Sequence, residues 1–170
     1  TIYKETDMHE IAVLLDYLTE LGVDGFMMSP AYGYDAVQQT NPNGADAIFM
    51  TREDIHAKFQ QARDLLKRYK LNLSPIYQEF LRGERNLNCA AWANPTRNVR
   101  GWKGPCYLIT DKHYKTHGDL VQLTDWDKLG RGKDPRCENC MVHCGFEPAA
   151  VLGVNSRLGD TLKMALWQLS

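Results

Sequence analysis

The residues best suited to chemistry in this chain are its five cysteines, which all lie between positions 89 and 144. Their spacing is Cys89-x16-Cys106, then thirty residues, then Cys137-x2-Cys140-x3-Cys144. Two thiolates separated by two residues can chelate one metal from a tight turn, and a second pair from elsewhere in the chain completes a four-sulfur site. The pattern therefore predicts a metal centre built mainly from thiolates.

The metal itself stays open at this point, because thiolates suit both structural zinc and iron–sulfur clusters. For zinc, the imidazole of His143 could replace one sulfur. An odd number of cysteines leaves one thiol over if all were paired, which disfavours a disulfide framework. The segment between the first two cysteines suits a hairpin or loop that presents two thiolates to one centre, since it is rich in turn formers: Asn94, Pro95, Asn98, Gly101, Gly104 and Pro105.

Length and charge limit the class of protein. A chain of 170 residues with 44% hydrophobic residues suits one domain, or slightly more, with a core of its own. A net charge of −1 argues against a nucleic-acid partner, for which a basic face is expected. No apolar run approaches the roughly twenty residues that cross a bilayer, and no signal-peptide leader opens the chain, so we expect a soluble, cytoplasmic protein.

The sequence begins at Thr1, without a methionine, and its first residues resemble the end of a strand. We therefore expect the chain to be a piece of a longer protein.

The first half of the chain alternates between strand-like and helix-like patterns. Three N-cap signals, each followed by apolar residues at helical spacing, predict helices: Asp7 with Glu10, Thr51 with Asp54, and Ser74 with Pro75. Short apolar stretches at residues 1–3, 23–28 and 70–73 predict strands. This order predicts an α/β fold, the latter part of a partial (β/α) TIM-like barrel, and three strands cannot close such a barrel.

Residues 31–50 show no sustained period and follow a predicted strand, so we expect a long loop at that strand's carboxyl end. In α/β barrels and open α/β sheets this is the face where ligands bind. Ser29, Tyr32 and Tyr34 are therefore candidate substrate- or cofactor-binding residues. The alternative for the two tyrosines is simply to cover the barrel rim.

From about residue 85 the helical period gives way to the cysteine region. There we expect a strand at 106–109 leaving the metal centre, and a short helix capped by Thr116 and Asp119. An amphipathic helix at about 158–169 should pack back on the barrel piece. The predicted organisation has three parts: the barrel part at 1–84, a small cysteine-rich module at 85–151, and the carboxyl-terminal helix at 152–170.

Several stretches resemble one known family. They are CAAWANPTRNVRGWKGPCYL from Cys89, TDWDKLGRG from Thr124, CENCMVHCGFE from Cys137, and, upstream, ELGVDGF from Glu20 and SPAYGY from Ser29. Together they resemble the carboxyl-terminal half of the radical S-adenosylmethionine enzymes of hopanoid biosynthesis, the adenosylhopene transferases, over essentially the whole chain. The glycine-spaced cysteine pair followed by Cys-x2-Cys also resembles the twitch or SPASM auxiliary-cluster domains of radical enzymes.

The resemblance implies a partial barrel that binds a catalytic [4Fe-4S] cluster and S-adenosylmethionine, with a carboxyl-terminal Fe–S module for a second cluster. In the family, the 5′-deoxyadenosyl radical adds to the double bond of hopene. By analogy with the twitch arrangement, the auxiliary-cluster ligands would be Cys89, Cys106, Cys137 and Cys140. Cys144 would then be the spare thiol, although it could also be the fourth ligand or a thiol that meets a substrate radical.

One departure from the family is important: the C-x3-C-x2-C motif that holds the catalytic cluster is absent from this chain. The resemblance therefore implies a carboxyl-terminal portion, inactive alone, whose S-adenosylmethionine is bound mainly by a missing amino-terminal half. The other implied partners are an apolar, hopene-like substrate, reached at a membrane surface, and an electron donor such as a flavodoxin or ferredoxin. The competing hypothesis is a zinc-stabilised interaction or regulatory module, in which Zn²⁺ only contributes folding free energy, on the order of 10 kcal/mol.

Overall fold

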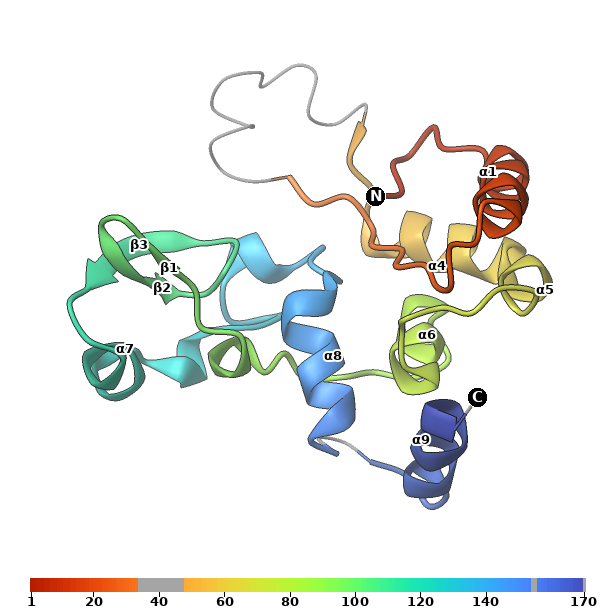
Figure 1. The fold of residues 1–170 in the computed structure, drawn as a ribbon. Coiled ribbons are helices and arrows are strands. Elements are labelled where there is room, and N and C mark those ends of the chain that lie inside the picture. The colour runs from red at the N-terminus through yellow and green to blue at the C-terminus, as the bar shows by residue number, and fades with distance from the viewer. Residues whose placement is uncertain (34–47, 154–155, 170) are drawn as a thin grey trace.

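The computed structural model describes residues 1–33, 48–153 and 156–169. In Figure 1, α8 stands between a lobe formed by the small sheet with α7 and a lobe formed by α1, α4, α5 and α6, with α9 beside α6. The helices are α1 (Met8–Glu20), α4 (Arg52–Gln61), α5 (Arg63–Leu66), α6 (Pro75–Leu81), α7 (His117–Leu123), α8 (His143–Val151) and α9 (Asp160–Leu169). The strands are β1 (Arg97–Asn98), β2 (Gly101–Pro105) and β3 (Thr110–Tyr114), and the 3₁₀ turns are η1 (Ala91–Ala93), η2 (Trp126–Lys128) and η3 (Pro135–Cys137).

Local capping chemistry sets where the helices begin. Helices α1, α4, α6 and α7 follow the predicted N-caps, whose side-chain oxygens accept a hydrogen bond from a backbone amide of the first turn: Asp7, Thr51, Ser74 and Thr116. At Thr51 and Thr116 the aspartate three residues later also accepts a bond from the cap's own amide, which completes a capping box. These four helix starts are confirmed.

The predicted strands of the first half are present as isolated parallel bridges instead of extended strands. Ile2 pairs in parallel with Pro30, and Phe26 pairs in parallel with Leu71. The amide of Ile2 donates to the carbonyl of Ser29 at 2.8 Å. Helix α1, and then α4 with α5, therefore connect neighbouring parallel segments, in the order that the sequence predicts. Closure of these segments into a barrel stays a prediction.

The sheet of the cysteine region is antiparallel, in the order β1-β2-β3. Trp102 on β2 lies opposite Tyr114 on β3. Gly101 has a φ of +129°, and a Cβ there would clash with the carbonyl oxygen of Tyr114, so this approach of β2 to β3 requires glycine. The hairpin therefore forms around a position that only glycine fits.

The predicted strand at 106–109 is wrong, because these residues form the turn that joins β2 to β3. The turn is closed by a hydrogen bond from the amide of Cys106 to the carbonyl of Ile109 at 3.3 Å. Strand β2 ends at Pro105, which has no amide hydrogen to extend the ladder. Cys106 therefore lies in the turn of a hairpin and not on a strand.

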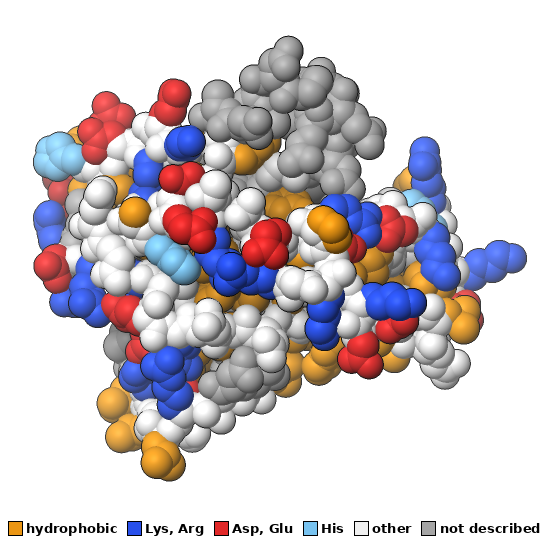
Figure 2. All heavy atoms as spheres, turned by 180° about the vertical axis from the view of Figure 1, so that it is seen from behind, with side chains coloured by type: hydrophobic (Ala, Val, Ile, Leu, Met, Phe, Trp, Pro, Cys, Tyr) orange, Lys and Arg blue, Asp and Glu red, His pale blue; other side chains and the backbone are white. Residues whose placement is uncertain are grey.

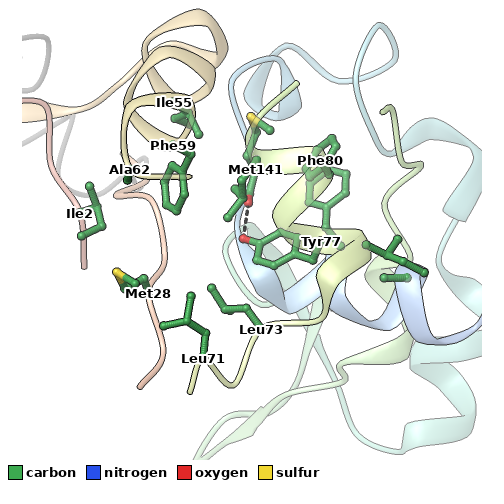
Figure 3. Packing of buried hydrophobic residues seen from close by; sticks show 14 of the residues in the cluster. Ile2, Met28, Ile55, Phe59, Ala62, Leu71, Leu73, Tyr77, Phe80 and Met141 are labelled. Atoms are coloured by element: carbon green, nitrogen blue, oxygen red, sulfur yellow. Dashed lines mark hydrogen bonds between the residues drawn. The ribbon is translucent and has the colours of Figure 1, made fainter. Parts of the chain in front are cut away.

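The hydrophobic core is organised around α6, whose residues Tyr77, Phe80 and Leu81 are at most 1% exposed. Figure 3 shows Tyr77 and Phe80 among the packed side chains of this core. The hydroxyl of Tyr77 donates to the carbonyl oxygen of Met141 at 2.7 Å. Phe80 stacks on Phe146 of α8 with ring centroids 4.4 Å apart. Helix α6 is therefore shared by the parallel segments and the cysteine segment, and it sets the position of one relative to the other.

Helix α9 is held against the rest of the chain by a buried ion pair. The guanidinium of Arg85 bonds both carboxylate oxygens of Asp160, at 3.0 and 2.8 Å, and also bonds Glu79 at 2.8 Å. Arg85 and Asp160 are only 5% and 4% exposed. A paired and fully hydrogen-bonded charge is the form in which an arginine can be buried. The carboxyl-terminal helix, predicted to pack back on the first half, lies against α6.

In the described part of the chain, no helix combines the length and the apolar character that crossing a membrane requires. On the face shown in Figure 2, acidic and basic side chains are interspersed. The mixture agrees with the near balance of 20 basic and 21 acidic residues in the sequence.

The Arg85 to Asp160 pair predicts a loss of stability in acid. The guanidinium of Arg85 lowers the pKa of Asp160 from 3.8 to about 2. The ionised carboxylate therefore stabilises the folded chain by about 2 kcal/mol above pH 4, and this contribution disappears as the pH falls through 2. We expect Asp160→Asn to lower the free energy of unfolding at pH 7 by about 3 kcal/mol, since one partner of a buried pair is lost. Urea titrations of both proteins at several pH values measure this. An equal loss between about pH 4 and pH 2 in the wild type and the variant would contradict the assignment.

Candidate metal centre

All five cysteines line one cavity of about 30 Å³. They reach it from separate parts of the cysteine region. Cys89 precedes η1, Cys106 lies in the hairpin turn, Cys137 ends η3, Cys140 follows it, and Cys144 lies in the first turn of α8. The structure therefore brings together every cysteine that the sequence marked as a candidate ligand.

Short hydrogen-bonded turns present these thiols. The amide of Ile109 donates to the sulfur of Cys106 at 3.3 Å. The amide of Cys140 donates to the carbonyl of Cys137 at 3.2 Å, which closes the tight turn expected of a Cys-x2-Cys pair. Amides that point at sulfur are typical of sites that hold thiolates, because they stabilise negative charge on the sulfur.

The start of α8 packs directly on the sulfur of Cys89. The amide of Ala90 donates to the carbonyl of Gly145 at 3.0 Å, so the two segments lie side by side. A Cβ on Gly145 would clash with the Sγ atom of Cys89. The glycine after Cys144 is therefore what allows Cys89 to reach the same cavity, and nothing in the sequence marks it for this role.

Burial dominates the acidity of the five thiols. It raises the pKa of Cys89 and of Cys144 to about 12, and raises the pKa of Cys140 well above its ordinary value. Repulsion between neighbouring thiolates raises the pKa of Cys89 further, while backbone amides oppose the shift, those of Ile109 and Leu108 for Cys106 and that of Val142 for Cys140. Without a cation the thiols are therefore protonated at neutral pH, and a bound metal would replace their protons.

The thiols converge on a shared cavity but not on a single point. Within residues 1–33, 48–153 and 156–169, no group of three His, Cys, Asp or Glu side chains is drawn close enough to hold a metal ion. A tetrahedral zinc site places its sulfurs about 3.8 Å apart, given a zinc to sulfur distance of about 2.3 Å. A cluster with several irons holds its thiolates farther apart. The five thiols are the donor type of both structural zinc and iron–sulfur sites, so the donor chemistry fits either metal.

Two of the three predicted binding residues lie beside the cysteines. The hydroxyl of Ser29 lies 3.1 Å from Nδ1 of His143, which directly precedes Cys144, and these residues are 114 positions apart in sequence. The hydroxyl of Tyr32 donates to the carbonyl of Arg136 at 2.7 Å, and Tyr32 also lines the thiol cavity. Tyr34 lies outside the described residues. Ser29 and Tyr32 thus belong to the surroundings of the cysteine site, although the sequence places them on the predicted barrel face.

The apolar wall of the cavity was not predicted. Besides the thiols and Tyr32, it is formed largely by hydrophobic side chains: Ala91, Leu108, Ile109, Leu129, Val142 and Phe146. None of these residues has a type or a spacing that distinguishes it from an ordinary core residue. They surround the sulfurs with a low-dielectric shell, which governs solvent access in metal sites.

A family model described as "Domain of unknown function (DUF3463)" matches residues 26–164. The chain belongs to this family. The matched span contains the five cysteines, Ser29 and Tyr32, so the whole thiol cavity lies inside the DUF3463 domain. The span also crosses both predicted boundaries, at 84/85 and 151/152, and that three-part organisation stays a prediction. No curated protein and no solved structure matches the chain.

The contact between Gly145 and Cys89 predicts that Gly145→Ala damages metal binding more than folding. The new methyl group would push the sulfur of Cys89 out of the cavity, and displacing one ligand should weaken metal retention by roughly tenfold or more. Metal retention against a chelator measures this. Gly118→Ala in α7 is the matched control, because a Cβ there meets nothing closer than Thr116 Oγ1 at 3.7 Å. Equal retention in the two variants would remove Cys89 from the ligand set.

Proposed function

We propose that this DUF3463 chain is the auxiliary-cluster portion of a radical S-adenosylmethionine enzyme, and that four of its cysteines hold a [4Fe-4S] cluster. The observation that supports this is the convergence of five thiols, from separate parts of the chain, on one cavity. The proposed ligands are Cys89, Cys106, Cys137 and Cys140, with Cys144 as the fifth thiol. When bound, such a cluster supplies one-electron transfer.

The donor chemistry supports a cluster. Thiolates are the ligands of iron–sulfur clusters, and five cysteines line one cavity here. The amide of Ile109, which donates to Cys106, is the kind of hydrogen bond that adjusts the potential of a cluster. The apolar wall surrounds the sulfurs with a low-dielectric shell.

The proposed reaction is the addition of a 5′-deoxyadenosyl radical to an isoprenoid alkene such as hopene, as the resemblance implies. This chain lacks the C-x3-C-x2-C motif, so S-adenosylmethionine would be bound and cleaved mainly by an amino-terminal half, with electrons supplied by a flavodoxin or ferredoxin. The role of this chain's own residues is to shape the thiol cavity. Ser29 and Tyr32 connect the first parallel segments to the cysteine segment through their contacts with His143 and Arg136.

A zinc-stabilised module is the second candidate, and the Cys137 to Cys140 turn favours it. This turn is closed by its own backbone hydrogen bond and could supply two of the four ligands of a Zn²⁺ ion. In that case the metal would contribute folding free energy and no catalysis.

Anaerobic reconstitution of the chain with iron and sulfide tests the proposal. We expect iron and sulfide in the ratio of one [4Fe-4S] cluster per chain, with the broad charge-transfer absorption of such a cluster. Cys106→Ala should abolish this absorption, whereas Cys144→Ala, which is matched in chemistry and removes the proposed spare thiol, should retain it. One tightly bound zinc with no iron uptake would sink the cluster proposal in favour of the structural module. Uptake of neither metal would sink both.

A further inference from the structure

A buried arginine lies against the proposed metal centre. Arg52 is the first residue of α4 and is 5% exposed. Its Nη2 atom donates to the carbonyl oxygen of Cys140 at 3.2 Å, and its backbone amide donates to Oδ1 of Asn139 at 3.2 Å. Arg52 therefore contacts the Cys-x2-Cys turn with both its side chain and its backbone.

No carboxylate among the described residues forms an ion pair with Arg52, although Glu138 and Glu53 lie near enough to act on its charge. The Nε atom of Arg52 is wholly buried without a hydrogen-bond partner, and the guanidinium packs over the ring of Phe80 at 5.2 Å. The nearby carboxylate of Glu138 is bonded instead to Arg131 at 2.8 Å. A buried charge without a counter-charge destabilises a folded protein by several kcal/mol.

Arg85 shows how the same chain buries an arginine when a partner is available. It is equally buried, at 5% exposed, yet it makes three charge-assisted hydrogen bonds to Asp160 and Glu79. Arg52 also stands at the amino-terminal end of α4, where the helix dipole disfavours a positive charge. The position of Arg52 is therefore unfavourable unless negative charge arrives beside it.

We propose that Arg52 is the counter-charge of the thiolate centre, a positioning residue that stabilises the ligated sulfurs and raises the reduction potential of the bound cluster. This inference rests on the proposed function. Four thiolates bring four negative charges, and neither Zn²⁺ nor a doubly charged iron–sulfur core neutralises them fully. A fixed cation against the Cys140 segment offsets part of the remainder, most strongly in the low-dielectric wall of the cavity.

An exogenous anion is a weaker explanation of the same charge. Arg52 also lines an open groove with Arg131, Lys133 and Trp92, and an anion could enter there. The unpartnered Nε atom is wholly buried, however, so a molecule in the groove does not reach it. The hydrogen bond to the carbonyl of Cys140 directs the guanidinium toward the metal-binding turn.

The test replaces Arg52 with methionine, which keeps the length of the side chain but removes the charge. In the reconstituted chain we expect Arg52→Met to lower the midpoint potential, because reduction adds negative charge that the cation no longer offsets. Retention of the metal against a chelator should weaken roughly 10–100-fold. Arg52→Lys should stay near the wild type in both measurements, and Arg68→Gln, at an exposed arginine, should change neither.

The metal-free chain separates this role from ordinary packing. If Arg52 gains its counter-charge only when the metal centre forms, the apo form of Arg52→Met should be at least as stable to urea as the wild type. Arg85→Met is the matched comparison, and its apo form should be less stable, because it leaves the buried carboxylate of Asp160 without its counter-charge.

Three results would decide against the inference. Unchanged potential and unchanged chelator resistance in Arg52→Met overturn it while leaving the proposed function intact. Destabilised apo Arg52→Met together with an unchanged potential also overturns it, in favour of a packing role. A wild-type chain that binds neither iron nor zinc overturns the proposed function and this inference together. If Arg52→Met does not fold, the midpoint potential and the metal retention of Arg52→Lys and Arg52→Gln are compared instead. If the chain binds only zinc, metal retention against the chelator decides.

Discussion

The hydrogen bond from Tyr77 to the carbonyl of Met141 is the interaction on which the rest of the structure depends. Both residues are fully buried, so neither polar group has water as an alternative partner. Tyr77 belongs to the helix at the centre of the hydrophobic core, and Met141 lies between Cys140 and Cys144. The bond thereby fixes the segment that carries Cys140 and Cys144 against the hydrophobic core. Leaving that carbonyl unpaired would cost about 1–3 kcal/mol.

The physical problem of the cysteine region is the burial of negative charge. Five partly buried thiols share one apolar cavity, and burial raises their pKa values because the thiolate form is poorly solvated there. Two kinds of polar group around the cavity favour the thiolate form instead. Backbone amides point at the sulfurs, and the cation of Arg52 stands against the Cys140 carbonyl. The same groups would be needed by any thiolate-held metal, whether it is a cluster or zinc.

The site also ties together parts of the chain that are far apart in sequence. Tyr32 and Arg136 are 104 positions apart, and Arg52 and Cys140 are 88 apart, yet each pair is joined by a hydrogen bond. The parallel segments of the first half are therefore part of the surroundings of the thiols and not merely a scaffold beneath them. In the proposed enzyme, this would couple the predicted barrel piece to the auxiliary centre.

The sequence by itself determined what depends on near neighbours. The capping boxes at Thr51 and Thr116 need only an aspartate three residues later, and the tight turn at Cys137 is closed by a backbone hydrogen bond from the residue three positions on. Tertiary structure decided the rest. The stretch 106–109 looked like a strand but became a turn once β2 had paired with β3. Arg52 reads as an ordinary helix residue and Gly145 as an ordinary glycine, because a missing counter-charge and a close approach of two segments exist only after distant residues have been packed together.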